Sequence, residues 1–212
     1  VLISRIKLSF VLINAMKNRT EEGWSERRRG LLRSRTSLSL SIGFLFGLVS
    51  AFGGETAPTS GVALSDTSHR VEFDPALSLA ERSFTVEAWV WFDDLSGDKP
   101  ILAQVGPGDL LHLLARNGRP WLGFWEDDLE GATALQTGRW YHLAYWFDAS
   151  TLEQRIYVDG VLDGSRTANG PANPDRGRLY AGEYAQLGLY SLDGRLLELR
   201  IWDHPRDPQA LD

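Results

Sequence analysis

From residue 61 onward, apolar and polar residues alternate in short runs that Gly, Pro, Asn and Asp interrupt. The clearest run is 84–92 (FTVEAWVWF), in which every even-numbered residue is apolar. Because the side chains of a strand point alternately to its two faces, this run predicts a strand with one core-facing side. No segment after residue 60 keeps a 3.6-residue apolar period, so strands are expected throughout this part of the chain.

The same pattern predicts further strands and the turns between them. Asn117-Gly118 and Asp159-Gly160 predict tight hairpins, because these residue pairs tolerate the positive φ that such turns need. Many short strands without helices between them predict an all-β, two-sheet antiparallel sandwich of the jelly-roll kind. The expected strands are 71–73, 84–92, 101–105, 110–115, 119–125, 140–148, 154–159, 161–165, 178–184 and 195–203.

The first part of the chain has a different composition. An Arg-rich run at 27–35 precedes an apolar run at 38–49, which is too short to span a bilayer, and small residues follow at 49–51. This order predicts a signal peptide that is cleaved near Phe52, with an uncleaved anchor as the alternative. The mature protein is therefore expected to be secreted, extracellular or periplasmic, with no membrane insertion after cleavage. We expect an upstream segment with the signal peptide at 1–51, a linker at 52–60 and one β domain at 61–212.

Charge divides the chain in the same way. Residues 1–54 hold nine Lys and Arg against three Asp and Glu, which leaves 13 basic and 25 acidic residues in 55–212 and a net charge of −12 there. A body this acidic repels phosphate backbones, so nucleic acid is not expected as a partner. The chain has no cysteine, which excludes disulfides, thiolate metal sites and a cysteine nucleophile.

Four segments of the body are similar to signatures of the laminin G-like, concanavalin A-like jelly-roll family. They are 84–90 (FTVEAWV), 138–144 (GRWYHLA), 155–160 (RIYVDG) and 194–202 (GRLLELRIW), in the family's order. The resemblance implies a sandwich with one concave face and with its first and last strands close together. It also implies an extracellular module that binds carbohydrate or protein, often with calcium. Leu197 departs from the family, which commonly has an acidic residue at this position.

Tryptophans give the first candidate site. Trp121, Trp125 and Trp146 lie on the side of their strands opposite the aliphatic residues. If these sides line the concave sheet, their rings can stack on the apolar face of a sugar, while His142 and Arg155 bind its hydroxyls. The alternative is that the rings fill the core or lie under loops. The other Trp residues with this placement are Trp89, Trp91, Trp140 and Trp202.

Acidic residues give two further candidates. Asp93, Asp94 and Asp98 cluster in one turn, where carboxylates could ligate a structural Ca²⁺. The series 126–130 (EDDLE) places Glu126, Asp128 and Glu130 on one side of an extended strand.

Laminarinase-like glycosidases of this fold use a Glu-x-Asp-x-Glu strand, with one Glu as nucleophile and the other as acid/base. Against this reading, Asp127 stands where an apolar residue is expected, and Gly131 follows at once. The sequence therefore favours a non-catalytic module for glycans over this enzyme. A protein-interaction or adhesion module is the other alternative.

Overall fold

A computed structural model describes residues 61–64, 70–73, 78–105, 111–124, 126–172, 177–184 and 190–211. The predictions for the signal peptide, the linker and Trp125 lie outside these residues. Within the described parts, no helix has the length and apolar character needed to cross a membrane.

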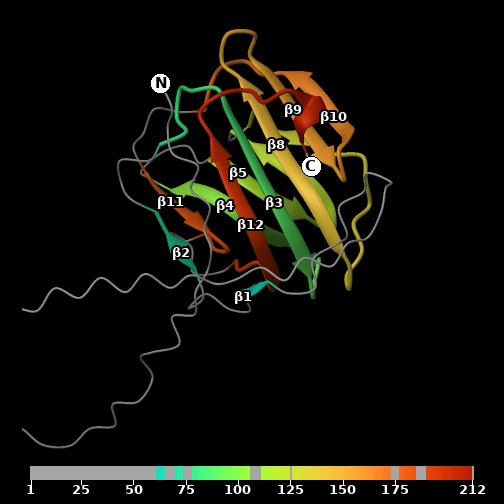
Figure 1. Cartoon of the computed structure of the whole chain (residues 1–212). Helices are drawn as coiled ribbons and strands as arrows, with labels where there is room; N and C mark the ends of the chain where they lie inside the picture. The colour runs from blue at the N-terminus through green and yellow to red at the C-terminus, as the bar shows by residue number, and fades with distance from the viewer. Residues whose placement is uncertain are drawn as a thin grey trace, which may run out of the picture. The chain divides into compact units, whose positions relative to one another are not determined.

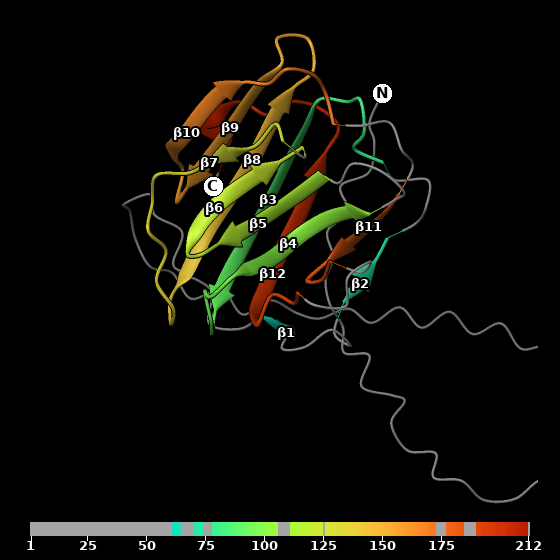
Figure 2. The same ribbon diagram turned by 180° about the vertical axis from the view of Figure 1, so that it is seen from behind.

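The described residues form two six-stranded antiparallel sheets, which confirms the all-β sandwich. Sheet A has the order β1-β12-β3-β8-β9-β10 and faces the viewer in Figure 1. Sheet B has the order β2-β11-β4-β5-β6-β7 and faces the viewer in Figure 2. The strands are β1 (Val62–Leu64), β2 (Val71–Glu72), β3 (Phe84–Phe92), β4 (Asp98–Val105), β5 (Leu111–Arg116), β6 (Arg119–Gly123), β7 (Leu129–Glu130), β8 (Trp140–Asp148), β9 (Glu153–Val158), β10 (Val161–Thr167), β11 (Arg178–Ala181) and β12 (Gly194–Trp202), and the 3-10 helix η1 (Pro208–Ala210) follows.

The strongest predicted elements form where the pattern placed them. Strand β3 has the predicted bounds, and its even-numbered residues are all buried. The turn at Asn117 and Gly118, with φ of 47° and 78°, joins β5 to β6. The turn at Asp159 and Gly160, with φ of 50° and 76°, joins β9 to β10. β12 pairs with both β1 and β3, so the first and last strands meet as the family resemblance implied.

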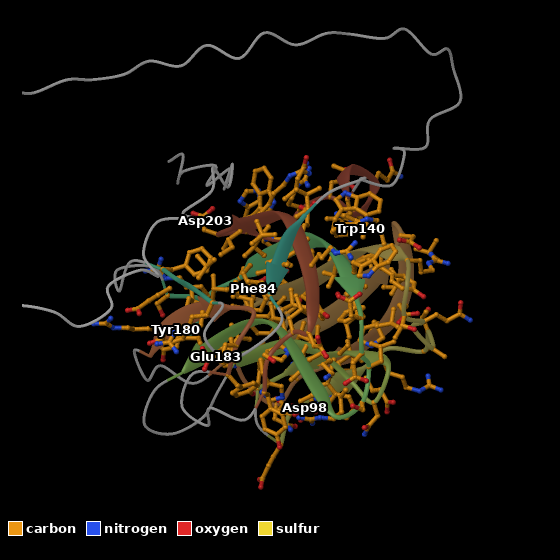
Figure 3. The ribbon with its side chains drawn as sticks, turned by 90° about the horizontal axis from the view of Figure 1, so that it is seen from below. Phe84, Asp98, Trp140, Tyr180, Glu183 and Asp203 are labelled. Atoms are coloured by element: carbon orange, nitrogen blue, oxygen red, sulfur yellow. The ribbon has the colours of Figure 1, made fainter. Side chains whose placement is uncertain are left out.

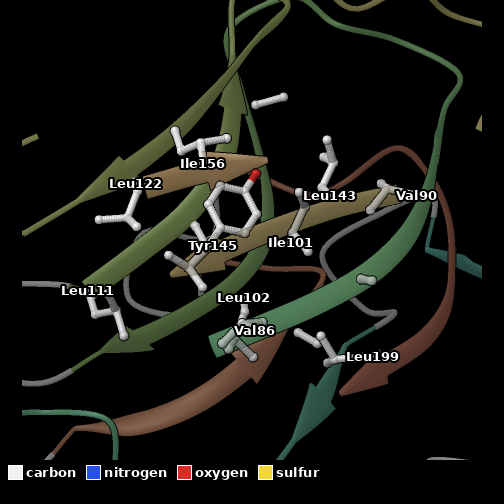
Figure 4. Close-up of a cluster of buried hydrophobic side chains, with 14 of the residues drawn as sticks. Val86, Val90, Ile101, Leu102, Leu111, Leu122, Leu143, Tyr145, Ile156 and Leu199 are labelled. Atoms are coloured by element: carbon white, nitrogen blue, oxygen red, sulfur yellow. The ribbon is translucent and has the colours of Figure 1, made fainter. Parts of the chain in front are cut away.

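The core lies between the two sheets and consists mainly of aliphatic and phenylalanine side chains. Figure 4 shows Val86 and Leu143 from sheet A together with Leu102 and Leu122 from sheet B. The buried Tyr145 hydroxyl donates to the Leu114 carbonyl oxygen at 3.0 Å and so links β8 to β5. No described tryptophan belongs to this cluster, so the described indole rings lie outside the core between the sheets.

Candidate functional site

The C-terminal segment, defined as residues 203–211, folds over the outer face of sheet A. Figure 1 shows it running from the end of β12 across the sheet to η1, beside β9 and β10. The Trp146 indole N–H donates to the Arg206 carbonyl oxygen at 3.0 Å. Leu211 packs on Trp146 and Tyr157, and all three side chains are buried. This face is therefore largely closed at β8 and β9.

A buried charge cluster holds the C-terminal segment in place. Glu87 projects from β3 on the outer face of sheet A, yet its side chain is fully buried. The Arg206 Nη1 group donates to Glu87 Oε1 at 2.5 Å. Arg200 Nη1 and His142 Nε2 lie 3.9 and 3.7 Å from Glu87 Oε2. Because a buried carboxylate needs compensating partners, this cluster is structural in character.

Three of the predicted ligand-binding residues belong to this covered face. His142 is buried, with its ring centre 5.4 Å from that of Trp89. Trp146 is buried under the C-terminal segment. Arg155 stacks over the Trp146 ring at 4.6 Å and binds both oxygens of Glu153 at 2.7 Å. The hydrogen bonds from Arg155 to Glu153 hold the pKa of its guanidinium above the usual range.

Trp121, the fourth predicted ligand-binding residue, lies on the opposite side of the sandwich. It projects from β6 on the outer face of sheet B, where Leu114 of β5 is its register partner. Its half-buried ring packs against the buried side chains of Ala103, Leu114 and Tyr184. The structure thus divides the predicted set between two faces, because His142, Trp146 and Trp121 belong to strands of different sheets.

Tyrosines extend the aromatic surface around Trp121. Tyr180 of β11 and Tyr190 are half-buried and pack against the same buried group. The ring of Tyr184 meets that of Tyr190 at 6.5 Å, edge to face. We call the rings of Trp121, Tyr180, Tyr184 and Tyr190 the aromatic face of sheet B. Figure 3 shows Tyr180, Glu183 and Asp98 on the side of sheet B, opposite Trp140 and Asp203.

Arginine–carboxylate pairs flank these rings. The Arg116 guanidinium lies 4.7 Å from the Trp121 ring centre and donates to both oxygens of Asp98 at 2.7 and 2.8 Å. The Arg70 guanidinium lies 5.5 Å from the Tyr180 ring centre and donates to Glu183 at 2.8 Å. The rings and the ion pairs together combine apolar faces with fixed hydrogen-bonding groups.

The middle of the aromatic face is buried. The His112 ring centre is 5.9 Å from that of Tyr184, and His112 Nε2 is 3.8 Å from Asp128 Oδ1. Burial raises the pKa of the Tyr184 hydroxyl well above its usual range. The outer rings of Trp121 and Tyr180 are therefore better placed than Tyr184 to contact a ligand.

The three predicted calcium ligands each have another partner. Asp93 accepts from the Trp91 indole N–H at 2.8 Å, and Asp98 is paired with Arg116. Asp94 lies 2.5 Å from Lys99 Nζ, and the hydrogen bonds from Lys99 and then Ser96 lower its pKa below its usual range.

A lysine ammonium beside Asp94 disfavours a further cation there, so these residues do not fit a calcium ion in this arrangement. Across the described residues, no three His, Asp or Glu side chains gather closely enough to hold a metal ion.

The glycosidase arrangement does not form on one strand. Glu126 has a left-handed backbone, with φ of 63°, and lies outside any strand. Asp128 accepts from the Phe124 backbone N–H at 3.0 Å, and Glu130 lies 3.3 Å from Arg119. The extended strand that the glycosidase alternative requires is therefore absent here, because the chain turns at Glu126 and only β7 continues.

A family model described as the concanavalin A-like lectin/glucanases superfamily, of the laminin G type, matches residues 65–211. The chain belongs to this superfamily. The four sequence signatures and the sandwich are thus explained by one family. A search of curated proteins finds no match to the chain.

Several solved structures share the fold of this chain. A Bacteroides ovatus protein, whose proposed role is carbohydrate binding, is 23% identical with a TM-score of 0.59, and the match covers 70% of this chain and 45% of that protein. Domain 4 of AbnA, an extracellular GH43 arabinanase from Geobacillus stearothermophilus solved with arabinotriose, is 18% identical with a TM-score of 0.53, over 70% and 73% of the two chains. The CBM40 of a Ruminococcus gnavus sialidase, solved with α2,3-sialyllactose, is 14% identical with a TM-score of 0.58, over 72% and 94%. This chain thus spans less than half of the Bacteroides protein.

Sequence reasoning identified one member of the aromatic face and missed the tyrosines. Tyr180 alternates with the buried residues Leu179 and Ala181, so its outward direction was readable from the strand pattern. Tyr184 and Tyr190 lie outside the strands, and no local pattern places them over β4 and β5. In this superfamily member, β11 pairs with β4, and this pairing places the tyrosines on the same sheet face as Trp121.

Proposed function

We propose that this superfamily member is a non-catalytic carbohydrate-binding module whose glycan site is the aromatic face of sheet B. One observation carries the proposal. The half-buried rings of Trp121 and Tyr180 project from sheet B, each beside an arginine–carboxylate pair. By contrast, the C-terminal segment covers the Trp-rich face of sheet A at Trp146.

The chemistry of the aromatic face suits sugars. The apolar C–H face of a sugar ring stacks on an indole or phenol ring, and its hydroxyls need donors and acceptors fixed at the edge. The pair of Arg116 and Asp98 supplies both beside Trp121, and the pair of Arg70 and Glu183 supplies both beside Tyr180. Such a combination can orient a sugar without any catalytic group.

The spacing of the rings favours an extended ligand. Tyr180 is on β11 and Trp121 is on β6, and the sheet order places β4 and β5 between them. Neighbouring strands are about 4.8 Å apart, so β11 and β6 are separated by roughly 14 Å across the sheet. We propose that an oligosaccharide runs across the strands, with one ring contact at each end.

The solved relatives support a carbohydrate-binding role for this chain. The arabinanase domain and the sialidase module were each solved with an oligosaccharide, and both share the fold of this chain. Retaining glycosidases need two carboxyl groups about 5 Å apart on either side of the scissile bond. Glu126 and Glu130 are not carried by one strand here, which supports a module that binds without cleaving.

Export and calcium support are further parts of the proposal. The charge, apolar run and small residues of 27–51 support a secreted protein. For calcium, the family resemblance is the support, while Asp93, Asp94 and Asp98 do not supply a ligand set. Binding measured with and without a chelator tests the calcium part, since loss of affinity after chelation would show that the ion contributes.

A glycan array with the full chain, followed by calorimetry on the strongest ligand, tests the proposed site. We expect Trp121→Ala to weaken binding about tenfold or more, because it removes a stacking surface. Trp91→Ala is the matched control, since Trp91 is also half-buried but lies on sheet A. An equal loss in both variants, or no glycan binding by the parent chain, would reject the proposed site.

A protein-interaction module is the second candidate function. Among the described residues, Val161 and Leu162 on the edge strand β10 are the exposed large apolar residues, at 69% and 52%. If the array shows no glycan ligand, replacing both with Ser and measuring capture of an extracellular protein partner becomes the next test. Capture that is unchanged by these substitutions would argue against that edge as the interface.

A further inference from the structure

We infer that the aromatic face of sheet B selects uncharged glycans over glycans that carry carboxylates or sulfates. This inference rests on the proposed function and names the class of sugar that the site binds. It depends on the charges around the rings, which are set by named ion pairs on the outer face of sheet B.

Every described arginine on the outer face of the sheet B strands, and Arg70 beside them, already has a carboxylate partner. Two of these pairs flank the rings, and the other two lie at the ends of the face. The pairs are Arg70 with Glu183 at 2.8 Å, Arg116 with Asp98 at 2.7 Å, Arg119 with Glu130 at 3.3 Å, and Arg178 with Glu72. An acidic sugar therefore finds no arginine here that is without a carboxylate.

The bidentate pair of Arg116 and Asp98 beside Trp121 disfavours an acidic sugar most strongly. Arg116 donates to Asp98 through Nε and Nη2, which is the geometry in which a guanidinium binds a carboxylate most specifically. An incoming carboxylate would have to displace the Asp98 side chain of β4 from Arg116, or lie close to the negative charge of Asp98. A hydroxyl has no such conflict, because it can accept from Nη1 of Arg116, which takes no part in that pair.

The other charges on the surface also disfavour acidic sugars. The four arginines of the face are balanced by their four partners, and Asp128 adds a further carboxylate near His112. The part of the chain from residue 55 onward carries a net charge of −12. Such a surface repels anionic ligands at physiological ionic strength, where the Debye length is about 8–10 Å.

The test compares matched sugars on the full chain. An array that presents neutral oligosaccharides and their sialylated or uronic-acid counterparts identifies ligands, and calorimetry then measures one matched pair, such as lactose and sialyllactose if lactose binds. We expect the neutral sugar to bind about tenfold more tightly in 0.15 M salt, with the difference decreasing as salt increases.

Two charge-neutralising variants test the cause. Glu183→Gln and Glu72→Gln should each shift the ratio of the two affinities toward the acidic sugar by about fivefold, because each releases an arginine from its partner. Glu72→Gln keeps the test valid if Glu183→Gln fails to fold, since Glu72 is on the surface whereas Glu183 is buried. Glu198→Gln is the matched control, because Glu198 pairs with Arg200 on sheet A and should leave the ratio unchanged.

The outcomes separate the two proposals. Acidic sugars that bind as tightly as their neutral counterparts, or ratios that do not respond to either variant, overturn the charge selection while the glycan site stands. No binding of either class overturns the proposed function itself.

Discussion

Arg206→Ala should weaken the fold more than an ordinary surface substitution does. Arg206 is in the C-terminal segment, and Glu87 is 119 residues away in the sequence. The side chain of Glu87 is 0% exposed, and that of Arg206 is only 19% exposed. Truncation of the arginine would therefore leave a buried carboxylate without its closest cation.

The size of the effect follows from the remaining partners. Removing one member of a buried ion pair typically costs about 3–5 kcal/mol. Here Arg200 and His142 stay within 3.9 and 3.7 Å of Glu87, so we expect a smaller loss of unfolding free energy, of about 2–3 kcal/mol. The backbone contacts of residue 206 with Trp146 and Thr85 are kept in the variant.

Urea unfolding, followed by tryptophan fluorescence, measures this loss. Arg178→Ala is the control, because Arg178 belongs to an exposed pair with Glu72 and should cost less than about 1 kcal/mol. The double variant Glu87→Gln/Arg206→Ala should show a coupling energy above about 1 kcal/mol. A loss for Arg206→Ala no larger than that of the control would refute the view that this pair secures the C-terminal segment.

Three further substitutions test the packing and the electrostatics. Tyr145→Phe should cost about 1 kcal/mol in urea unfolding, because the buried Leu114 carbonyl loses its donor, and an unchanged midpoint would contradict this role. Gly194→Ala should cost about 3 kcal/mol by the same measurement, because a Cβ there would lie 2.0 Å from the Trp91 carbonyl oxygen, and a parent-like stability would show that β12 can shift. Asp94→Asn should flatten the fall in thermal midpoint below about pH 4, because a carboxylate whose folded-state pKa is lowered stabilises the fold above its ordinary pKa and loses that contribution as the pH falls. Parallel pH profiles for the parent and this variant would contradict the last expectation.

Alternation and turn chemistry were sufficient to predict most strands. The run at 84–92 became β3 with the predicted bounds, and both predicted hairpin turns formed with positive φ. The three-residue strand β1, the two-residue strand β7 and the end of β6 at Gly123 were less predictable. These strands are too short for a periodic pattern, and their bounds depend on pairing with neighbours rather than on their own sequence.

The candidate site was predictable only in part. The outward direction of Trp121, Trp146 and His142 follows from local alternation, which is a property of a strand by itself. Their grouping does not, because residues on strands of two different sheets can share the same pattern and still face opposite sides of a sandwich.

The sequence by itself determined that this is a β-sandwich whose strand tryptophans point away from the aliphatic side of their strands, since side-chain direction is set by backbone geometry within a few residues. Only the tertiary structure decided which of these rings a later segment covers. Trp146 is closed off by residue 206, and Tyr180 comes to the same face as Trp121 through the pairing of β11, β4, β5 and β6. Such contacts join residues far apart in the chain, so they follow from the packing of the whole domain and leave no local signal.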